Sequence, residues 1–161
     1  MTGIDVRPAG SDDASYIHGT LADGFGDTVV VGHGEMIDAA AQPTLVAWRG
    51  DERVGLLTYR SHPDQTACEI VTINTTTPGI GAGAALIDAV RERARRSGAV
   101  RLWLVTTNDN THALRFYQRN GFDLTALSYD AVTLARALKP SIPEVLDGIA
   151  LRHELVLERR P

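Results

Sequence analysis

The chain has 161 residues, the size of one domain, and its composition of 43% hydrophobic and 22% charged residues is ordinary for a soluble globular protein. Its formal net charge of −4 argues against a nucleic-acid-binding protein, because no basic face is indicated. Cys68 is the only cysteine, which excludes an internal disulfide and a thiolate metal cluster, and a buried structural thiol is favoured over a nucleophile there.

The amino-terminal residues, MTGIDVRPAGSDD, contain neither the basic nor the apolar segment of a secretory signal. No apolar run approaches the length of a membrane span. We therefore expect a cytoplasmic protein with no membrane partner.

The first 42 residues predict a strand and two helical segments. Residues 4–7 alternate like a short strand, and Ser11 or Asp12 begins a helix that is interrupted by glycines before residue 26. Residues 28–31 are β-like and residues 35–41 are rich in helix formers, and together residues 28–42 predict a loop followed by a short helix. Acidic residues in this region suit a cationic substrate, although a solvated surface is the commoner role of such charges: Asp23, Asp27, Glu35 and Asp38.

The rest of the chain predicts an antiparallel meander followed by alternating helices and strands. Strands are expected at residues 44–48, 54–60 and 68–74. A helix is expected at residues 81–97, ending at Gly98, followed by a strand at 100–105. The next helix is capped by Asp109 or Asn110 and runs to Arg119. A strand at 122–130, a helical turn at 131–138 and a closing strand at 149–158 complete the chain. This order predicts a single α/β domain over residues 1–161 with a mixed sheet.

A glycine-rich turn, GIGAGA at residues 79–84, precedes the helix expected at 81–97. Its backbone N–H groups and the helix dipole would suit a phosphate. Gly79, Gly81 and Ala84 fit a permissive dinucleotide fingerprint, but Asp109 lies beyond the spacing expected of the ribose-binding acid. A P-loop is excluded because no Gly-Lys-Ser/Thr ends the turn, and a turn without any ligand is the third interpretation.

The same turn, with Leu86 after Gly79, Gly81 and Gly83, resembles the pyrophosphate loop of the GNAT superfamily of N-acetyltransferases. Pro78 stands where the family form has Arg or Gln. A second signature of that superfamily follows at the expected separation, formed by Asn110, Ala113, Phe116, Tyr117, Gly121 and Phe122. The resemblance covers about residues 45–160 and is closest to bacterial members without an assigned substrate.

The resemblance implies a GNAT fold, in which a mixed, mostly antiparallel central sheet is flanked by helices. It also implies direct transfer of acetyl from acetyl-CoA, without a metal, to a primary amine of a small molecule, peptide or protein. The backbone of Gly79, Ile80, Gly81, Ala82, Gly83 and Ala84 would hold the pyrophosphate. Val71, Thr72 and Ile73 would pair with the pantetheine arm, Asn110 would contact that arm, and Tyr117 would lie beside the thioester sulfur.

Acetyl transfer needs a neutral amine, and an amine with a pKa of about 10.4 is mostly protonated at pH 7, so a base helps. Glu69 is the predicted base by its place at the start of the strand that leads to the glycine turn; a solvent-facing strand residue is the alternative. Tyr117 is the predicted acid for the departing thiolate, with a core aromatic beside Phe116 as its alternative. Glu154 is a second candidate carboxylate, for which a surface strand position is favoured.

Three other functions remain open. A nicotinamide-dependent oxidoreductase would follow from the dinucleotide interpretation. A CoA-binding regulatory module would bind the cosubstrate without turnover, and a relative with another acyl donor would prefer a longer acyl-CoA. A homodimer is compatible with the resemblance, and none of the five histidines has the spacing of metal ligands.

Overall fold

A computed structural model of the chain describes residues 3–161 and divides it into two compact units. The first unit comprises the residues up to Val29, Asp38–Leu102 and Arg160–Pro161, and the second comprises Val30–Ile37 and Trp103–Arg159. The fold class is the one predicted, with mixed α/β structure, mostly antiparallel strands and helices packed on them. The prediction of a single domain includes residues 1 and 2, which lie outside the described residues, and stays a prediction.

The first unit is built on four antiparallel strands in the order β1-β4-β5-β6. Their bounds are β1 Ile4–Pro8, β4 Thr44–Arg49, β5 Glu52–His62 and β6 Ala67–Thr75, which confirms the predicted meander. Most of β4 and the middle of β5 are buried, as their runs of Leu, Val and Ala require.

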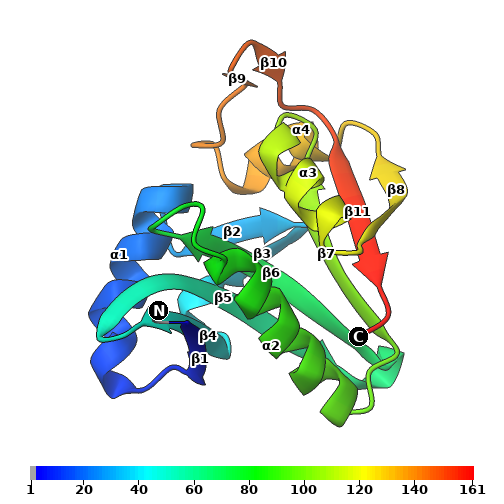
Figure 1. The fold of residues 1–161 in the computed structure, drawn as a ribbon. Helices are drawn as coiled ribbons and strands as arrows, with labels where there is room; N and C mark the ends of the chain where they lie inside the picture. The colour runs from blue at the N-terminus through cyan, green and yellow to red at the C-terminus, as the bar shows by residue number, and fades with distance from the viewer. Residues whose placement is uncertain (1–2) are drawn as a thin grey trace. The chain divides into compact units, whose positions relative to one another are not determined.

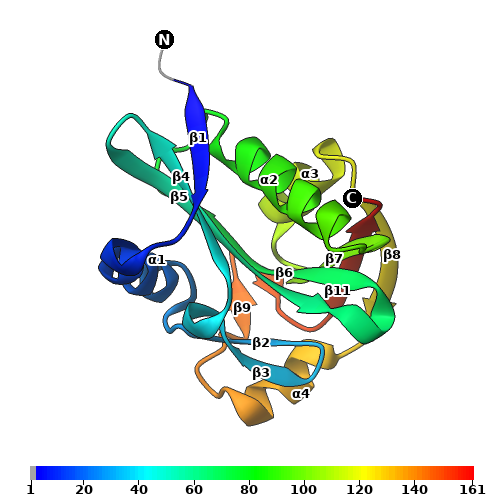
Figure 2. The same cartoon turned by 90° about the horizontal axis from the view of Figure 1, so that it is seen from below.

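Helix α2, Ala82–Arg96, packs on this sheet and buries the apolar stripe that the sequence predicts, including Leu86, Ile87 and Val90. Gly98 follows it with φ 82°, the left-handed conformation predicted for the residue that ends the helix. Helix α1, Ala14–Phe25, lies on the opposite face of the sheet from α2 (Figure 2). α1 is continuous through its glycines rather than interrupted, because Ile17 and Leu21 anchor it in a core cluster with Ala39 and Leu56.

A β-bulge interrupts the pairing of β5 with β6. Thr58 lies opposite Thr72, but the next residue, Tyr59, lies opposite Ile70, so Val71 has no partner in the register. Because side chains alternate along a strand, this one-residue shift changes every pair that follows. It brings Arg60 directly opposite Glu69.

Residues 29–38 form a β-hairpin, with β2 at Val29–Gly32 and β3 at Glu35–Asp38. The loop and the helix predicted for this region are therefore both wrong, apart from a 3-10 turn at Ala39–Ala41. His33 and Gly34 have φ values of 41° and 81°, the pair of positive values that a two-residue hairpin turn requires. This turn fixes the segment as a hairpin in spite of its helix-forming residues.

The remaining strands of the second unit are ordered β7-β11-β8, with bounds Arg101–Thr107, Glu154–Arg159 and Asp123–Ser128. β8 and β11 run side by side and antiparallel (Figure 1). The helices are α3, Thr111–Arg119, and α4, Ala131–Leu138, both close to their predicted limits. The predicted closing strand is divided into β10, Ile149–Ala150, which pairs with β9, Val145–Leu146, and the separate strand β11.

No helix within residues 3–161 has both the length and the apolar character that a membrane span requires.

Candidate functional site

The predicted pyrophosphate loop is an open turn at the start of α2. Gly79 and Gly81 have φ values of 80° and 84°, and a Cβ atom added to either would meet nothing within 4 Å. Gly81 is the N-cap of α2 and has no side chain to cap it, so the first amides of the helix are left for another acceptor. The fifteen-residue length of α2 gives this end a full helix dipole. The geometry fits a phosphate held by backbone N–H groups, with Ile80 in the turn and Ala82, Gly83 and Ala84 in its first helical residues.

The strand predicted to pair with pantetheine is the part of β6 that contains the bulge. Thr72 is buried, and its hydroxyl lies 2.7 Å from the hydroxyl of Thr58, so its side chain serves the interior of the sheet. Val71 and Ile73, on either side of it, are partly exposed. A ligand at this strand would therefore meet main-chain groups rather than the Thr72 side chain.

Glu69 is buried, with 3% of its surface exposed, so the solvent-facing alternative is wrong. Arg60 donates a hydrogen bond from Nε to Oε1 of Glu69 at 2.8 Å, and Nε2 of His62 lies 3.1 Å from the same oxygen. All three residues belong to the first unit, on β5 and β6. A buried carboxylate needs such partners, because desolvation without them would cost several kcal/mol.

Arg60 and His62 were not predicted as site residues. They lie eight and six residues before Cys68 in the sequence. If the pairing of β5 with β6 had no bulge, Arg60 would lie opposite Ile70. Only the bulge at Val71 brings Arg60 and Glu69 together. A bulge of this kind has no marker here, since Val is an ordinary strand residue.

Cys68, next to Glu69, is almost completely buried. Burial, and then the charge of Glu69, raise the pKa of its thiol to about 11. The sulfur is therefore protonated at neutral pH and is not a thiolate nucleophile, which agrees with the structural role that was favoured.

Tyr117 lies in the second unit, on α3, with 5% of its surface exposed. Its ring meets those of Phe116 and Phe122 edge to face, at centroid distances of 5.2 and 5.5 Å. Its hydroxyl makes no hydrogen bond to any residue from 3 to 161. Burial raises the pKa of Tyr117 far above its usual range, so the phenol keeps its proton at every physiological pH.

Asn110 is the N-cap of α3, one of the two residues predicted for that position. Its Oδ1 accepts a hydrogen bond from the Ala113 N–H at 3.2 Å. The cap uses the carbonyl oxygen of the side chain, and the amide group of this exposed residue is left as a donor for a ligand.

Glu154 is also buried, with 4% of its surface exposed, and the surface position favoured for it is wrong. Its Oε2 accepts a hydrogen bond at 2.9 Å from the backbone N–H of His33, in the turn of the β2–β3 hairpin. Both residues belong to the second unit. Glu154 thus holds the hairpin turn, a contact between positions 121 residues apart in the chain.

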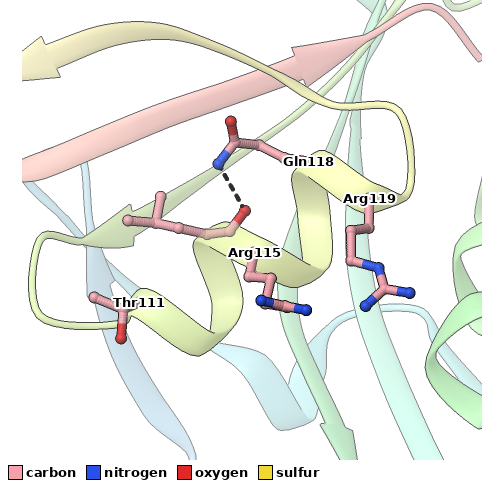
Figure 3. Close-up of a pocket in the computed structure, with 5 residues that line it drawn as sticks. Thr111, Arg115, Gln118 and Arg119 are labelled. Atoms are coloured by element: carbon pink, nitrogen blue, oxygen red, sulfur yellow. Dashed lines mark hydrogen bonds between the residues drawn. The ribbon is translucent and has the colours of Figure 1, made fainter.

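The outer surface of α3 carries a shallow pocket of about 530 Å³ (Figure 3). Gln118 at its edge donates a hydrogen bond to the Leu114 carbonyl at 3.0 Å, while Arg115 and Arg119 project together from the other side of the helix. Neither arginine has an ion pair or hydrogen bond with residues 3–161, and like charges four residues apart on a helix repel each other. This surface favours anions.

The other candidate groups do not gather into a site. Within the described part of the chain, no three His, Cys, Asp or Glu side chains are placed to hold a metal ion. Asp23, Asp27, Glu35 and Asp38 are all exposed, which is the commoner role that was expected of them.

The chain matches the family described as "Acetyltransferase (GNAT) family" over residues 20–122. It is 39% identical over 109 residues to the uncharacterized protein YdhI of Bacillus subtilis, a match that spans 67% of each chain. Among solved structures it is similar to an IAA acetyltransferase from Bacillus cereus, with a TM-score of 0.75, 19% identity and coverage of 99% of this chain and 100% of that one. It is also similar to a GNAT family acetyltransferase from Elizabethkingia anophelis with acetyl-CoA bound, with a TM-score of 0.69, 19% identity and coverage of 100% of both chains.

Proposed function

Because the chain belongs to the GNAT family of acetyltransferases, we propose that it transfers the acetyl group of acetyl-CoA to a primary amine. The observation that carries the proposal is the uncapped glycine turn at the start of α2. A turn of this shape presents several N–H groups and a helix dipole to one anion, as the pyrophosphate of acetyl-CoA requires. The acceptor is a small molecule or a peptide. The four exposed acidic residues described above form no cluster that would indicate which amine binds.

Individual residues are assigned separate parts in binding. In the first unit, the backbone of residues 79–84 holds the pyrophosphate, and the main chain of Val71 and Ile73 pairs with the pantetheine arm. In the second unit, Asn110 donates a hydrogen bond to that arm from its side-chain amide. When bound, acetyl-CoA supplies an activated thioester, and no metal is needed.

The chemistry is a direct displacement. The amine nitrogen forms a bond to the thioester carbon, the carbon–sulfur bond breaks, and the acetylated amine and coenzyme A thiolate result. Tyr117, which is protonated at neutral pH, donates its proton to the thiolate, and the proton that the attacking nitrogen loses restores the phenol. The cluster formed by Glu69, Arg60 and His62 receives the proton that the ammonium group must lose before attack.

The glycine turn can be tested with a matched pair of variants. Gly81 and Gly98 lie at opposite ends of α2, have φ values of 84° and 82°, and both face open space. Ala at either position should cost about 1 kcal/mol of stability from the positive φ. Gly81→Ala should also weaken acetyl-CoA binding about tenfold, the loss of about one hydrogen bond, whereas Gly98→Ala should leave the Kd unchanged.

Isothermal titration with acetyl-CoA measures both variants, and equal Kd values would remove the turn from the site. Turnover is then measured as coenzyme A release with a panel of polyamines, aminoglycosides, aromatic amines and lysine peptides. Tight binding of acetyl-CoA without turnover of any amine would favour the regulatory module instead. Faster release from a longer acyl-CoA would indicate another acyl donor.

A further inference from the structure

We propose that the imidazole of His62 is the group that takes the proton from the acceptor amine, and that Glu69 is a positioning residue held in place by Arg60. This inference rests on the proposed acetyl transfer and assigns one step of it. It follows from the hydrogen-bond pattern of three side chains on β5 and β6.

Glu69 is poorly suited to take the proton itself. Its Oε1 already accepts a hydrogen bond from Arg60 Nε at 2.8 Å and faces His62 Nε2 at 3.1 Å, and 3% of the residue is exposed. The guanidinium favours the ionised carboxylate, because an adjacent positive charge stabilises the charged form of an acid. A base must bind a proton readily during the reaction, and this ion pair opposes that.

His62 has the arrangement of an oriented base. A carboxylate oxygen can only accept, so the proton between the two groups belongs to Nε2 of His62. Nδ1 is then the basic nitrogen of the neutral imidazole. Glu69 fixes the ring and stabilises the imidazolium once it forms, as the carboxylate does in a Ser-His-Asp triad. The His62 side chain is 22% exposed, against 4% for that of Glu69, so it is the more accessible member of the pair.

The proposed step is a simple proton transfer. The ammonium form of the acceptor loses a proton to Nδ1 of His62, directly or through a water, and becomes the neutral amine whose lone pair attacks the thioester. His62 becomes an imidazolium paired with the Glu69 carboxylate. It releases the proton to solvent after the product leaves, so one proton is released per turnover and no other reactant is needed.

The test is the acid limb of the kcat/KM profile, followed with the panel amine that gives the fastest coenzyme A release. His62→Gln can still donate to Glu69 but cannot act as a base, so kcat should fall about 100-fold and the acid limb should disappear. Glu69→Gln keeps the base but removes the carboxylate that orients it, so kcat should fall less than in His62→Gln and the acid limb should remain. If Glu69 is the base, the result reverses: Glu69→Gln loses the limb and His62→Gln keeps it.

Further measurements separate the step from folding and from the proposed function. His18→Gln, an exposed histidine on α1, should leave the profile unchanged. In His62→Ala, added imidazole should restore part of the rate, and no restoration would count against the assignment. The NMR shifts of the two His62 ring nitrogens need no amine: a neutral ring that carries its proton on Nδ1 rather than Nε2 would overturn the arrangement. Absence of acetyl-CoA binding would instead contradict the proposed function.

Discussion

Glu69 and Tyr117, the two residues assigned to the ends of proton transfer by sequence, are buried to nearly the same extent, with 3% and 5% of their surfaces exposed. Their surroundings differ. Glu69, in the first unit, lies against a guanidinium and an imidazole, whereas the Tyr117 hydroxyl, in the second unit, has no hydrogen bond within residues 3–161 and its ring meets two phenyl rings.

The difference shows that partners, and not burial alone, decide which protonation state a buried group holds. The ion pair with Arg60 favours the ionised form of Glu69 in spite of its burial. Desolvation acts on Tyr117 without opposition, so the phenol stays neutral. Glu69 is thus suited to stabilise a neighbouring cation, whereas Tyr117 holds its proton at neutral pH.

The largest expected effect is on stability at Glu69. Glu69→Ala removes the buried carboxylate that pairs with the half-buried Arg60 guanidinium, which should lower the free energy of unfolding by about 3 kcal/mol. Urea denaturation followed by circular dichroism measures the change. A loss below about 1 kcal/mol would mean that solvent, and not Glu69, satisfies Arg60.

For Tyr117→Phe we expect the opposite: little change in stability and a large loss of activity. The hydroxyl makes no hydrogen bond within the described chain, so its removal should change the free energy of unfolding by less than about 0.5 kcal/mol. Loss of the acid should nevertheless lower kcat about 100-fold with the best panel amine. An unchanged kcat would remove Tyr117 from the mechanism and leave it as a core aromatic.

Asp13 extends the comparison to a third buried group. Burial by itself would raise its pKa, but a hydrogen bond from the Gly10 N–H and the ion pair with Arg53 outweigh burial and lower it. A lowered pKa stabilises the fold above the unfolded value of about 3.9 and loses that contribution as pH falls through the folded value. Asp13→Asn should therefore cost about 1.5 kcal/mol at pH 7 and progressively less below pH 4.

The control for Asp13 is Asp5→Asn, because the Asp5–Arg7 pair is exposed and should contribute nothing measurable. Urea denaturation between pH 3 and 7 compares the two variants with the wild type. A difference for Asp13→Asn that stays constant over this range would contradict the role of its charge.

Among the buried carboxylates, the smallest loss of stability is expected at Glu154, which is bonded to a neutral N–H rather than to a cation. Glu154→Gln keeps an oxygen that can accept from His33, so we expect a loss of about 1 kcal/mol. Amide hydrogen exchange at His33 reports the contact directly. A loss as large as that of Glu69→Ala would mean that Glu154 is paired with a charge.

The parts of the candidate site that were predicted from sequence depend on neighbouring residues. The turn at residues 79–84 follows from glycines that tolerate positive φ just before an amphipathic helix. The capped helix from Thr111 to Arg119 follows from Asn110 at its start and from Gly121, with a positive φ, just beyond its end. Each of these features depends on residues that are close together in the sequence, so local conformational propensity is enough to predict it.

The parts that were missed depend on contacts across the fold. The β2–β3 hairpin needs a positive φ at His33, a non-glycine residue, which competes against the helix-forming composition of residues 35–41. Glu154 was expected at the surface because its partner lies 121 positions away. Arg60 and His62 were missed because a bulge without a sequence marker sets their register against β6.

The sequence by itself therefore determined the family, the α/β class and the backbone features that suit acetyl-CoA, since these depend on glycine conformations and on the periods of helices and strands. Only the tertiary structure decided what the buried side chains can do. Pairing between β5 and β6 placed a guanidinium and an imidazole against Glu69, whereas the rings of Phe116 and Phe122 lie against Tyr117 on α3. The protonation state of a buried group is set by the few atoms around it, and strand register and helix packing decide which residues supply those atoms.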